Sequence, residues 1–173
     1  MKEILSHSDL KVQVAKLADA ILKQHTDIGD IVFIGVQQGG VVLADEIVAV
    51  LQSQLKDQPI NYGQLDITFY RDDIRNEILA PDVMHIPFSI ENKIVILIDD
   101  VLFTGRTIKA ALDALIDLGR PEKIELCVLI DRKEHRQFPI QADFAGIDVK
   151  TEKTDKIKLQ KDNNGNKNVV LIN

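Results

Sequence analysis

The chain has 173 residues, a formal net charge of −6 at pH 7, and hydrophobic and charged fractions of 45% and 28%. These values predict one domain, residues 1–173, with a sizeable core, and they exclude a protein that coats nucleic acids through overall positive charge. The single cysteine, the lack of a signal peptide and the lack of a membrane-length apolar stretch predict a cytoplasmic protein that does not enter a membrane.

The N-terminal third contains two helical segments and one strand. Ser8 can cap a first helix over about residues 9–25, in which apolar residues recur at helical spacing. The apolar run Ile31–Val36 predicts a strand. It ends in the loop Gln37–Gly40, and a second helix is expected over about residues 41–55.

The middle of the chain alternates apolar runs with polar segments. A strand is expected over Gln64–Tyr70, and the next strand, Ile94–Ile98, ends at two adjacent acids. Between them, Arg71–Pro87 has mixed polarity and two prolines, which predicts a mobile surface loop. A helix from about residue 107 to 118 follows the acids, and Gly119 fits its C-terminal cap.

The C-terminal part completes the predicted sheet. The run Ile124–Ile130 predicts a buried strand, in which Cys127 is a small buried side chain rather than a nucleophile. The tail predicts a β-hairpin with strands Lys156–Leu159 and Asn168–Ile172. Strands that alternate with helices predict an α/β fold, with a mostly parallel, doubly wound sheet and this C-terminal β-hairpin.

The segment Val95–Thr107, VILIDDVLFTGRT, is the most informative part of the sequence. A buried strand ends in Asp99 and Asp100, and a hydroxyl-rich loop then opens a helix. Unpaired N–H groups at a helix start bind phosphate, while paired acids suit ribose hydroxyls or a hydrated Mg²⁺. The segment therefore predicts a site for a phosphorylated sugar. The alternative is an ordinary strand–turn–helix with solvated acids and a threonine cap.

The loop Gln37–Gly40 has a similar position, after a strand and before a helix. Its two glycines allow the backbone to approach an anion closely. The alternative is a tight turn without a ligand. No nucleophile–base triad is visible, and the four histidines lack metal-ligand spacing.

The sequence DDVLFTGRT resembles the phosphoribosyl-pyrophosphate-binding motif of the type I phosphoribosyltransferases, which joins two acids through a short link to Thr-Gly and a second hydroxyl residue. Four further segments are most similar to the bacterial pyrimidine operon attenuation regulators, which are also uracil phosphoribosyltransferases. They are GQLDITFYRDD at 63–73, LGRP at 118–121, LIDR at 129–132 and HRQFPIQAD at 135–143. The resemblance extends from about Ile31 to the C-terminus.

This resemblance implies transfer of a phosphoribosyl group from phosphoribosyl pyrophosphate to uracil, which gives UMP and pyrophosphate. Asp99 and Asp100 would face the ribose hydroxyls, and Asp100 would stabilise positive charge near the anomeric carbon. Mg²⁺ would be bound mainly through substrate oxygens. The residues expected to bind substrate around the motif are Asp99, Asp100, Val101, Leu102, Phe103, Thr104, Gly105, Arg106 and Thr107.

The resemblance also implies a pyrophosphate-binding loop, made of Gln37, Gln38, Gly39 and Gly40. Relatives usually carry a cation there and this chain does not, so Arg71, Arg75 or Mg²⁺ is expected to supply the charge. Arg71 is thus also a candidate catalytic residue, with a plain solvated charge as the alternative. Arg132 is expected beside the base, with a surface ion pair as the alternative. Ile157 is expected to present its backbone to the uracil edge.

Relatives of this kind also bind a messenger-RNA leader when uridine nucleotides are abundant, which requires a basic surface. The first helix offers three lysines but no arginine. A later segment keeps Lys133, His135 and Arg136 but has Gln141 where arginine is common. Weak RNA binding is therefore expected. A true RNA-binding attenuator and a phosphoribosyltransferase for another base are the alternatives.

Such relatives form dimers that assemble further, which implies a homodimer or a higher homo-oligomer. Val83, Met84, Ile86 and Phe88 are apolar residues that could form an interface. The alternative is that they fold back onto the core.

Overall fold

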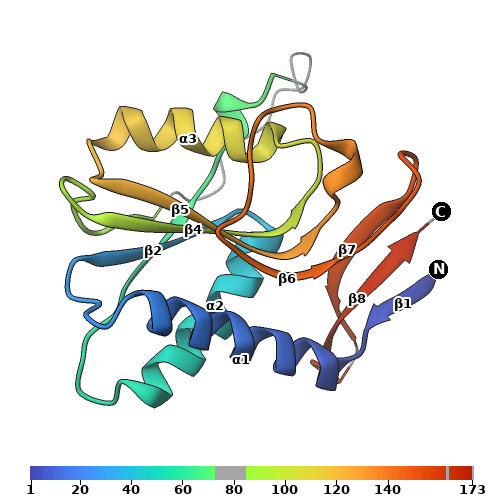
Figure 1. Cartoon of the computed structure of the whole chain (residues 1–173), viewed down its shortest axis with the longest axis horizontal. Helices are drawn as coiled ribbons and strands as arrows, with labels where there is room; N and C mark the ends of the chain where they lie inside the picture. Colours follow the sequence, from blue (N-terminus) through green and yellow to red (C-terminus); the bar gives the residue numbers. More distant parts are fainter. Residues whose placement is uncertain (73–84, 163, 173) are drawn as a thin grey trace.

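Figure 1 shows the computed structural model, which describes residues 1–72, 85–162 and 164–172. The strands in this part of the chain are β1 (Lys2–Leu5), β2 (Ile31–Val36), β3 (Asn61–Leu65), β4 (Ile94–Leu102), β5 (Lys123–Asp131), β6 (Phe144–Asp148), β7 (Lys156–Lys161) and β8 (Lys167–Ile172). The helices are α1 (His7–Gln24), α2 (Gly39–Gln54) and α3 (Arg106–Leu118), with the 3-10 helices η1 (Thr68–Tyr70) and η2 (Lys133–His135).

The described strands form two sheets. A five-stranded parallel sheet has the order β3-β2-β4-β5-β6, and a three-stranded antiparallel sheet has the order β1-β8-β7. Helices α1 and α2 lie on one face of the parallel sheet and α3 lies on the other, while the small sheet stands at one end of it (Figure 1). The expected α/β fold, with a doubly wound parallel sheet and C-terminal antiparallel strands, is confirmed.

The central strands are apolar on both sides because helices cover both faces of the sheet. Every residue of β2 is buried. Its side chains alternate between the two layers, so that Phe33 packs with α1 and α2, whereas Ile34 packs with residues of α3. Cys127 is fully buried in β5, as expected. None of the helices in the described residues has the length and apolar character needed to cross a membrane.

The first helix begins two residues earlier than the sequence pattern predicts. Its N-cap is Ser6 rather than Ser8: the Asp9 backbone N–H donates to Ser6 Oγ, and the Ser6 backbone N–H donates to the Asp9 carboxylate. This reciprocal pair requires an acid three residues after the cap, and Asp9 stands at that distance from Ser6. The prediction of Ser8 as the cap was therefore wrong.

The strand expected over Gln64–Tyr70 ends at Leu65, and residues Thr68–Tyr70 form η1 instead. Asp66 Oδ1 accepts hydrogen bonds from the backbone N–H and the hydroxyl of Thr68, at 2.8 and 2.6 Å. This local turn competes with the β-ladder and ends the strand. Most of the loop predicted over Arg71–Pro87 lies outside the described residues.

The strand predicted over Ile94–Ile98 continues to Leu102, so the two acids lie within β4 rather than after it. The ladder with β5 continues past them, since Asp99 pairs with Val128 and Leu102 pairs with Asp131. Hydrogen bonding to β5 therefore holds the acids on a rigid element.

Two strands have no counterpart in the sequence analysis. Strand β6 extends the parallel sheet beside β5, and β1 pairs with β8 so that the expected hairpin becomes a three-stranded sheet. Ile86 and Phe88 pack against the core, which supports the alternative that they fold back. Val83 and Met84 lie outside the described residues.

Candidate active site

The two loops singled out by sequence meet at the carboxyl ends of β2 and β4. Gly39 lies so close to Asp100 that a Cβ on this glycine would overlap the Asp100 carboxylate. A Cβ on Gly40 would overlap the carbonyl oxygen of Ile98. Only glycine permits this close approach, so the sequence Gly39-Gly40 packs the start of α2 directly onto the acids.

The two acids are adjacent, with Asp99 buried and Asp100 half-buried. Asp99 is 6% exposed, and its Oδ1 accepts the Asp100 backbone N–H at 3.0 Å. Burial raises the pKa of Asp99 well above its usual range, the Asp100 charge raises it further, and Arg71 opposes the shift. Burial also raises the pKa of Asp100, and a hydrogen bond with Asp99 opposes that shift. Among the described residues, burial therefore outweighs the partners that would stabilise the ionised forms of the two acids.

Strand β7 reaches the acids from the small sheet. The backbone of Leu159 lies near the Asp100 carboxylate and opposes the rise in the pKa of that group. A cavity of about 360 Å³ lies here, lined by Gln38, Gly39, Val42, Asp100, Ile157, Lys158 and Leu159. The structure thus brings Ile157 together with the glycine loop and Asp100, as the sequence resemblance implies.

The loop after β4 forms a second cavity, of about 230 Å³. Gly105 is the N-cap of α3 and has φ 91°, a left-handed conformation that favours glycine. The backbone N–H of Arg106 donates to Thr104 Oγ1 at 3.3 Å. This cavity is lined by Arg71, Val101, Leu102, Phe103, Thr104, Gly105, Arg106, Thr107 and Ile108. It joins a helix start to two arginines, which suits a phosphate group.

The two arginines of this cavity have different surroundings. Arg71 acts electrostatically on Asp99, whereas Arg106 forms an ion pair with Asp72 at 2.6 Å and donates to Gln137 at 3.1 Å. Arg75, the other candidate cation, lies outside the described residues. Arg71 is therefore the described cation that is placed to act on both the acids and the phosphate cavity.

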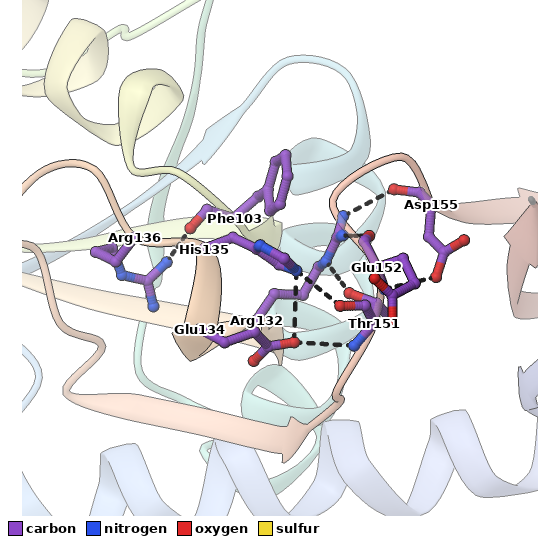
Figure 2. Close-up of polar contacts among 8 residues, drawn as sticks. All are labelled: Phe103, Arg132, Glu134, His135, Arg136, Thr151, Glu152 and Asp155. Carbon is purple, nitrogen blue, oxygen red and sulfur yellow. Dashed lines mark hydrogen bonds and ion pairs between the residues drawn. The ribbon is translucent and has the colours of Figure 1, made fainter.

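Gln37 and Arg132 are placed differently from the other expected residues. The Gln37 backbone N–H donates to the carbonyl of Leu65 at 3.0 Å, and the peptide bond between Gln37 and Gln38 is cis. Arg132 is 2% exposed, so the alternative of a surface ion pair is wrong. Its guanidinium group contacts the loop before β7 and the ring of Phe103 (Figure 2).

Four residues that line the cavities were missed in the sequence analysis: Val42, Ile108, Lys158 and Leu159. Val42 and Ile108 follow the two glycine loops, and their positions could have been found by extending each loop into its helix. Lys158 and Leu159 contribute because the small sheet packs against the end of the large one. No pattern in the sequence gives that packing.

The three residues of the later segment that were predicted to contact RNA are engaged within the chain. Arg136 binds the Asp131 carboxylate and the Phe103 carbonyl, and Lys133 forms an ion pair with Asp148 at 2.6 Å. His135 Nε2 lies 2.7 Å from the carbonyl of Thr151. An RNA phosphate would have to compete with these contacts.

The acidic side chains of the site can be compared with what the expected magnesium ion requires. In the part of the chain that the structure describes, no three His, Cys, Asp or Glu side chains are grouped closely enough to hold a metal ion. The Asp99–Asp100 pair offers two carboxylates of raised pKa, which a cation would favour in their ionised forms. These residues fit a hydrated Mg²⁺ that is carried mainly by substrate oxygens.

Comparisons with known proteins agree with this geometry. The family described as phosphoribosyl transferase domain matches residues 1–171. Three similar curated proteins are each called bifunctional protein PyrR. The protein from Enterococcus faecalis V583 is 41% identical over 99% of this chain and 96% of its own length. The protein from Chloroflexus aurantiacus is 42% identical over 99% of this chain and 94% of its own length. The protein from Geobacter sp. M21 is 43% identical over 98% of this chain and 96% of its own length.

Solved structures show the same fold at lower identity. A hypoxanthine phosphoribosyltransferase from Staphylococcus aureus has a TM-score of 0.70 at 21% identity, over 88% of this chain and 79% of that one. The hypoxanthine phosphoribosyltransferase of Trypanosoma cruzi has a TM-score of 0.74 at 17% identity, over 99% of this chain and 95% of that one. At this identity the likeness extends to the fold alone.

Proposed function

Because the chain belongs to the phosphoribosyl transferase family, we propose that it transfers the 5-phosphoribosyl group from phosphoribosyl pyrophosphate to uracil, giving UMP and pyrophosphate. The observation that carries this proposal is the contact of Gly39 with Asp100, with a cavity on each side of the strand end. The choice of uracil follows from the similarity to the PyrR proteins and from the segment Leu65–Asp73.

Each part of the substrate has a place in this arrangement. The 5-phosphate occupies the cavity formed by Val101–Ile108, where backbone N–H groups and Arg71 favour an anion. The ribose hydroxyls face Asp99 and Asp100, and the pyrophosphate lies against Gln38 and Gly39. The base then sits beneath Ile157, in the cavity that Ile157 lines together with Gln38 and Asp100.

Asp100 is the group assigned to the chemical step. Departure of pyrophosphate leaves positive charge on the ribose, and a half-buried carboxylate beside the anomeric carbon stabilises that charge most in the transition state. Mg²⁺, when bound with the substrate, supplies positive charge to the leaving pyrophosphate. The rigid strand β4 holds the Asp100 carboxylate in a fixed position, so that it is already oriented toward the substrate.

The glycine loop carries no cation of its own, since it reads Gln-Gln-Gly-Gly. Its contribution is therefore limited to neutral donors, namely backbone and amide N–H groups. Among the described cations, Lys158 lines the cavity of the glycine loop, whereas Arg71 lines the phosphate cavity and is the one that acts on Asp99. We assign Arg71 the role of supplying positive charge in the reaction.

A panel of bases tests this proposal directly. Uracil, cytosine, hypoxanthine and guanine are each incubated with the protein, phosphoribosyl pyrophosphate and Mg²⁺, and pyrophosphate release is measured. Uracil should give turnover, with UMP as the product. Turnover with a purine base and none with uracil would contradict the proposal and support a phosphoribosyltransferase of different specificity.

RNA binding is the second candidate function, because the similar proteins are called bifunctional. We infer that it is weak here, since Lys133, His135 and Arg136 are engaged within the chain. Each phosphate contact adds about −0.7 to −0.9 to the slope of log K against log salt, so few contacts give a shallow slope. Filter binding to the leader RNA of its own pyrimidine genes, with UMP present, measures this; nanomolar affinity at physiological salt would contradict it.

The expected homo-oligomer and the expected cytoplasmic location stay predictions. Light scattering of the purified protein gives its mass in solution and so decides the first of them.

A further inference from the structure

Arg132 is a buried arginine at the end of β5 whose donors all point to one loop. Its Nε donates to Thr151 Oγ1 at 2.7 Å, Nη1 to the carbonyl of Asp155 at 3.1 Å, and Nη2 to the carbonyl of Glu152 at 2.8 Å. We call the segment Thr151–Asp155 the hood loop. Figure 2 shows the guanidinium group directed into this loop. A planar group with fixed donors can hold three acceptors in one arrangement, which an ammonium group cannot do.

The hood loop leads directly into β7, which reaches the proposed active site. Ile157 and Leu159 of β7 line the same cavity as Asp100, and the Leu159 backbone lies near the Asp100 carboxylate. A shift of the hood loop would therefore change the distance between β7 and Asp100. Arg132 follows β5, an inner strand of the parallel sheet that pairs with β4 and β6. Its backbone is therefore held firmly, while its side chain reaches the hood loop.

Two neighbours of Arg132 hold the same loop. His135 Nε2 lies 2.7 Å from the carbonyl of Thr151, and the Thr151 backbone N–H donates to Glu134 at 2.8 Å. The guanidinium carbon of Arg132 is also 3.8 Å from the centre of the Phe103 ring, and His135 meets that ring edge-on at 5.2 Å. Figure 2 shows these groups gathered around the hood loop.

The phosphate-binding loop touches the Arg132 side chain through Phe103, but it also has support that does not need this side chain. Backbone N–H groups of Arg132, Gln137 and Phe138 donate to the carbonyls of Leu102 and Thr104, at 2.9, 2.9 and 3.2 Å. The side chain of Arg132 donates three hydrogen bonds to the hood loop, whereas the phosphate-binding loop keeps these backbone hydrogen bonds when that side chain is lost. Loss of the Arg132 side chain should thus affect the base-binding side more than the phosphate-binding side.

We propose that Arg132 is a positioning residue that fixes β7 above Asp100, and so sets the fit of the base without touching it. This inference rests on the proposed function, because it assigns the base to the cavity beneath Ile157. Direct contact of Arg132 with the base is not needed, since its side chain already reaches Thr151, Glu152 and Asp155.

The test compares Arg132→Met with Lys133→Met, a neighbouring substitution in an exposed ion pair. Arg132→Met should raise the KM for uracil by about tenfold or more and change the KM for phosphoribosyl pyrophosphate less than about twofold, as expected for misplacement of one side of the site. Lys133→Met should leave both values unchanged. Arg132→Lys should recover less than half of the loss, because one ammonium cannot replace the planar group.

A second variant guards against misfolding of Arg132→Met. Thr151→Val removes the acceptor of Arg132 Nε with little change of shape, and it should raise the KM for uracil in the same selective way. An unchanged KM for uracil in both variants overturns the proposal. An equal rise in both KM values also overturns it, since that result indicates general loosening.

Hydrogen exchange separates failure of this inference from failure of the proposed function. Without any substrate, amides of residues 152–159 should exchange faster in Arg132→Met than in Lys133→Met, while those of residues 104–108 keep their rates. If wild type shows no turnover of uracil, the proposed function fails, and this exchange experiment still decides the positioning role. Equal exchange of residues 152–159 in the two variants contradicts it.

Discussion

Acidic side chains lie at opposite ends of the neighbouring strands β4 and β5, and their surroundings differ sharply. At the carboxyl end of β4, Asp99 and Asp100 adjoin each other, and burial raises the pKa of both. Near the amino end of β5, Glu125 is fully buried but accepts hydrogen bonds from Gln24 at 2.7 Å and Lys123 at 2.5 Å, and lies 2.6 Å from His25 Nε2. Burial alone would raise the pKa of Glu125, but Lys123 and His25 outweigh burial and the pKa is lowered.

The comparison separates a carboxylate that stabilises the fold from a pair that does not. Glu125 has its partners within the chain, so its charge is stabilised in the folded state. Burial raises the pKa of both Asp99 and Asp100, so ionisation of either carboxyl group opposes folding. Among the described residues, Arg71 opposes the raised pKa of Asp99 without cancelling it, so a cation supplied by a ligand would stabilise the charged pair. Strand carboxyl ends are the usual ligand-binding edge of such sheets.

The largest effect is expected from Asp100→Asn. If Asp100 stabilises charge that develops only in the transition state, loss of its charge should lower kcat with uracil by about 10² or more. The KM values should change much less. Steady-state pyrophosphate release measures both quantities, and Asp113→Asn on the exposed side of α3 is the control. Equal kcat for wild type and Asp100→Asn would remove Asp100 from the chemistry.

Glu125→Gln should lower stability while leaving the site intact. The change removes charge from hydrogen bonds with Lys123 and His25, and bonds to charged groups contribute about 1.5–3 kcal/mol each in stability. We expect the free energy of unfolding to fall by about 2 kcal/mol in urea denaturation. Glu122→Gln is the exposed control. The kcat should stay at the wild-type value, and a large loss of kcat would show that the two regions are coupled.

Asp99→Asn should have the opposite effect on stability. The amide oxygen can still accept the Asp100 backbone N–H, while the unfavourable buried charge is removed. We expect the free energy of unfolding at pH 7 to rise by about 1 kcal/mol, with reduced activity, as is usual when a functional group is replaced by a stabilising one. Asp57→Asn serves as an exposed control. A loss of stability would contradict the view that this region is maintained for a ligand.

The smallest effect concerns pH. The pKa of Glu125 is lower in the folded protein, so the stability that it contributes is present above its unfolded pKa and is lost as pH falls through the folded value. The difference in unfolding free energy between wild type and Glu125→Gln should shrink below about pH 4.3, the usual glutamate pKa. For Asp99 the sign is reversed, because a raised folded pKa makes its ionisation destabilising as pH rises above its unfolded value. A constant difference for Glu125→Gln across acid pH would contradict this assignment.

The sequence predicts the central sheet and the phosphate loop well because their signals are local. Apolar runs such as Ile31–Val36 match strands, and Gly105 with its flanking threonines marks the helix start. The sequence placed the two acids after the strand, whereas they lie within it. The sequence shows where apolar character ends and not where hydrogen bonding to β5 ends. Asp99 is buried because its strand pairs with β5, and the residues next to Asp99 in the sequence do not reveal this pairing.

Parts that depend on contacts between distant segments were not predicted. Glu125 lies in an apolar run, and its partner His25 is far away in sequence, so no local pattern identifies the pair. The same holds for Arg132 and the hood loop, which meet only after β6 and β7 are in place. Strand β1 has four residues and pairs with β8 near the other end of the chain. Short elements held by such pairings leave weak sequence signals.

The central claim is that Asp99 and Asp100 form a ligand site, whereas Glu125 serves the fold. The most direct test is the rise in melting temperature caused by phosphoribosyl pyrophosphate with Mg²⁺, measured for wild type, Glu125→Gln and Asp99→Asn/Asp100→Asn. At about 100 times the dissociation constant, wild type should gain about 5 °C or more. Glu125→Gln should gain the same amount from a lower starting temperature, and the double variant should gain little. No gain in wild type, or an equal gain in all three proteins, would contradict the account.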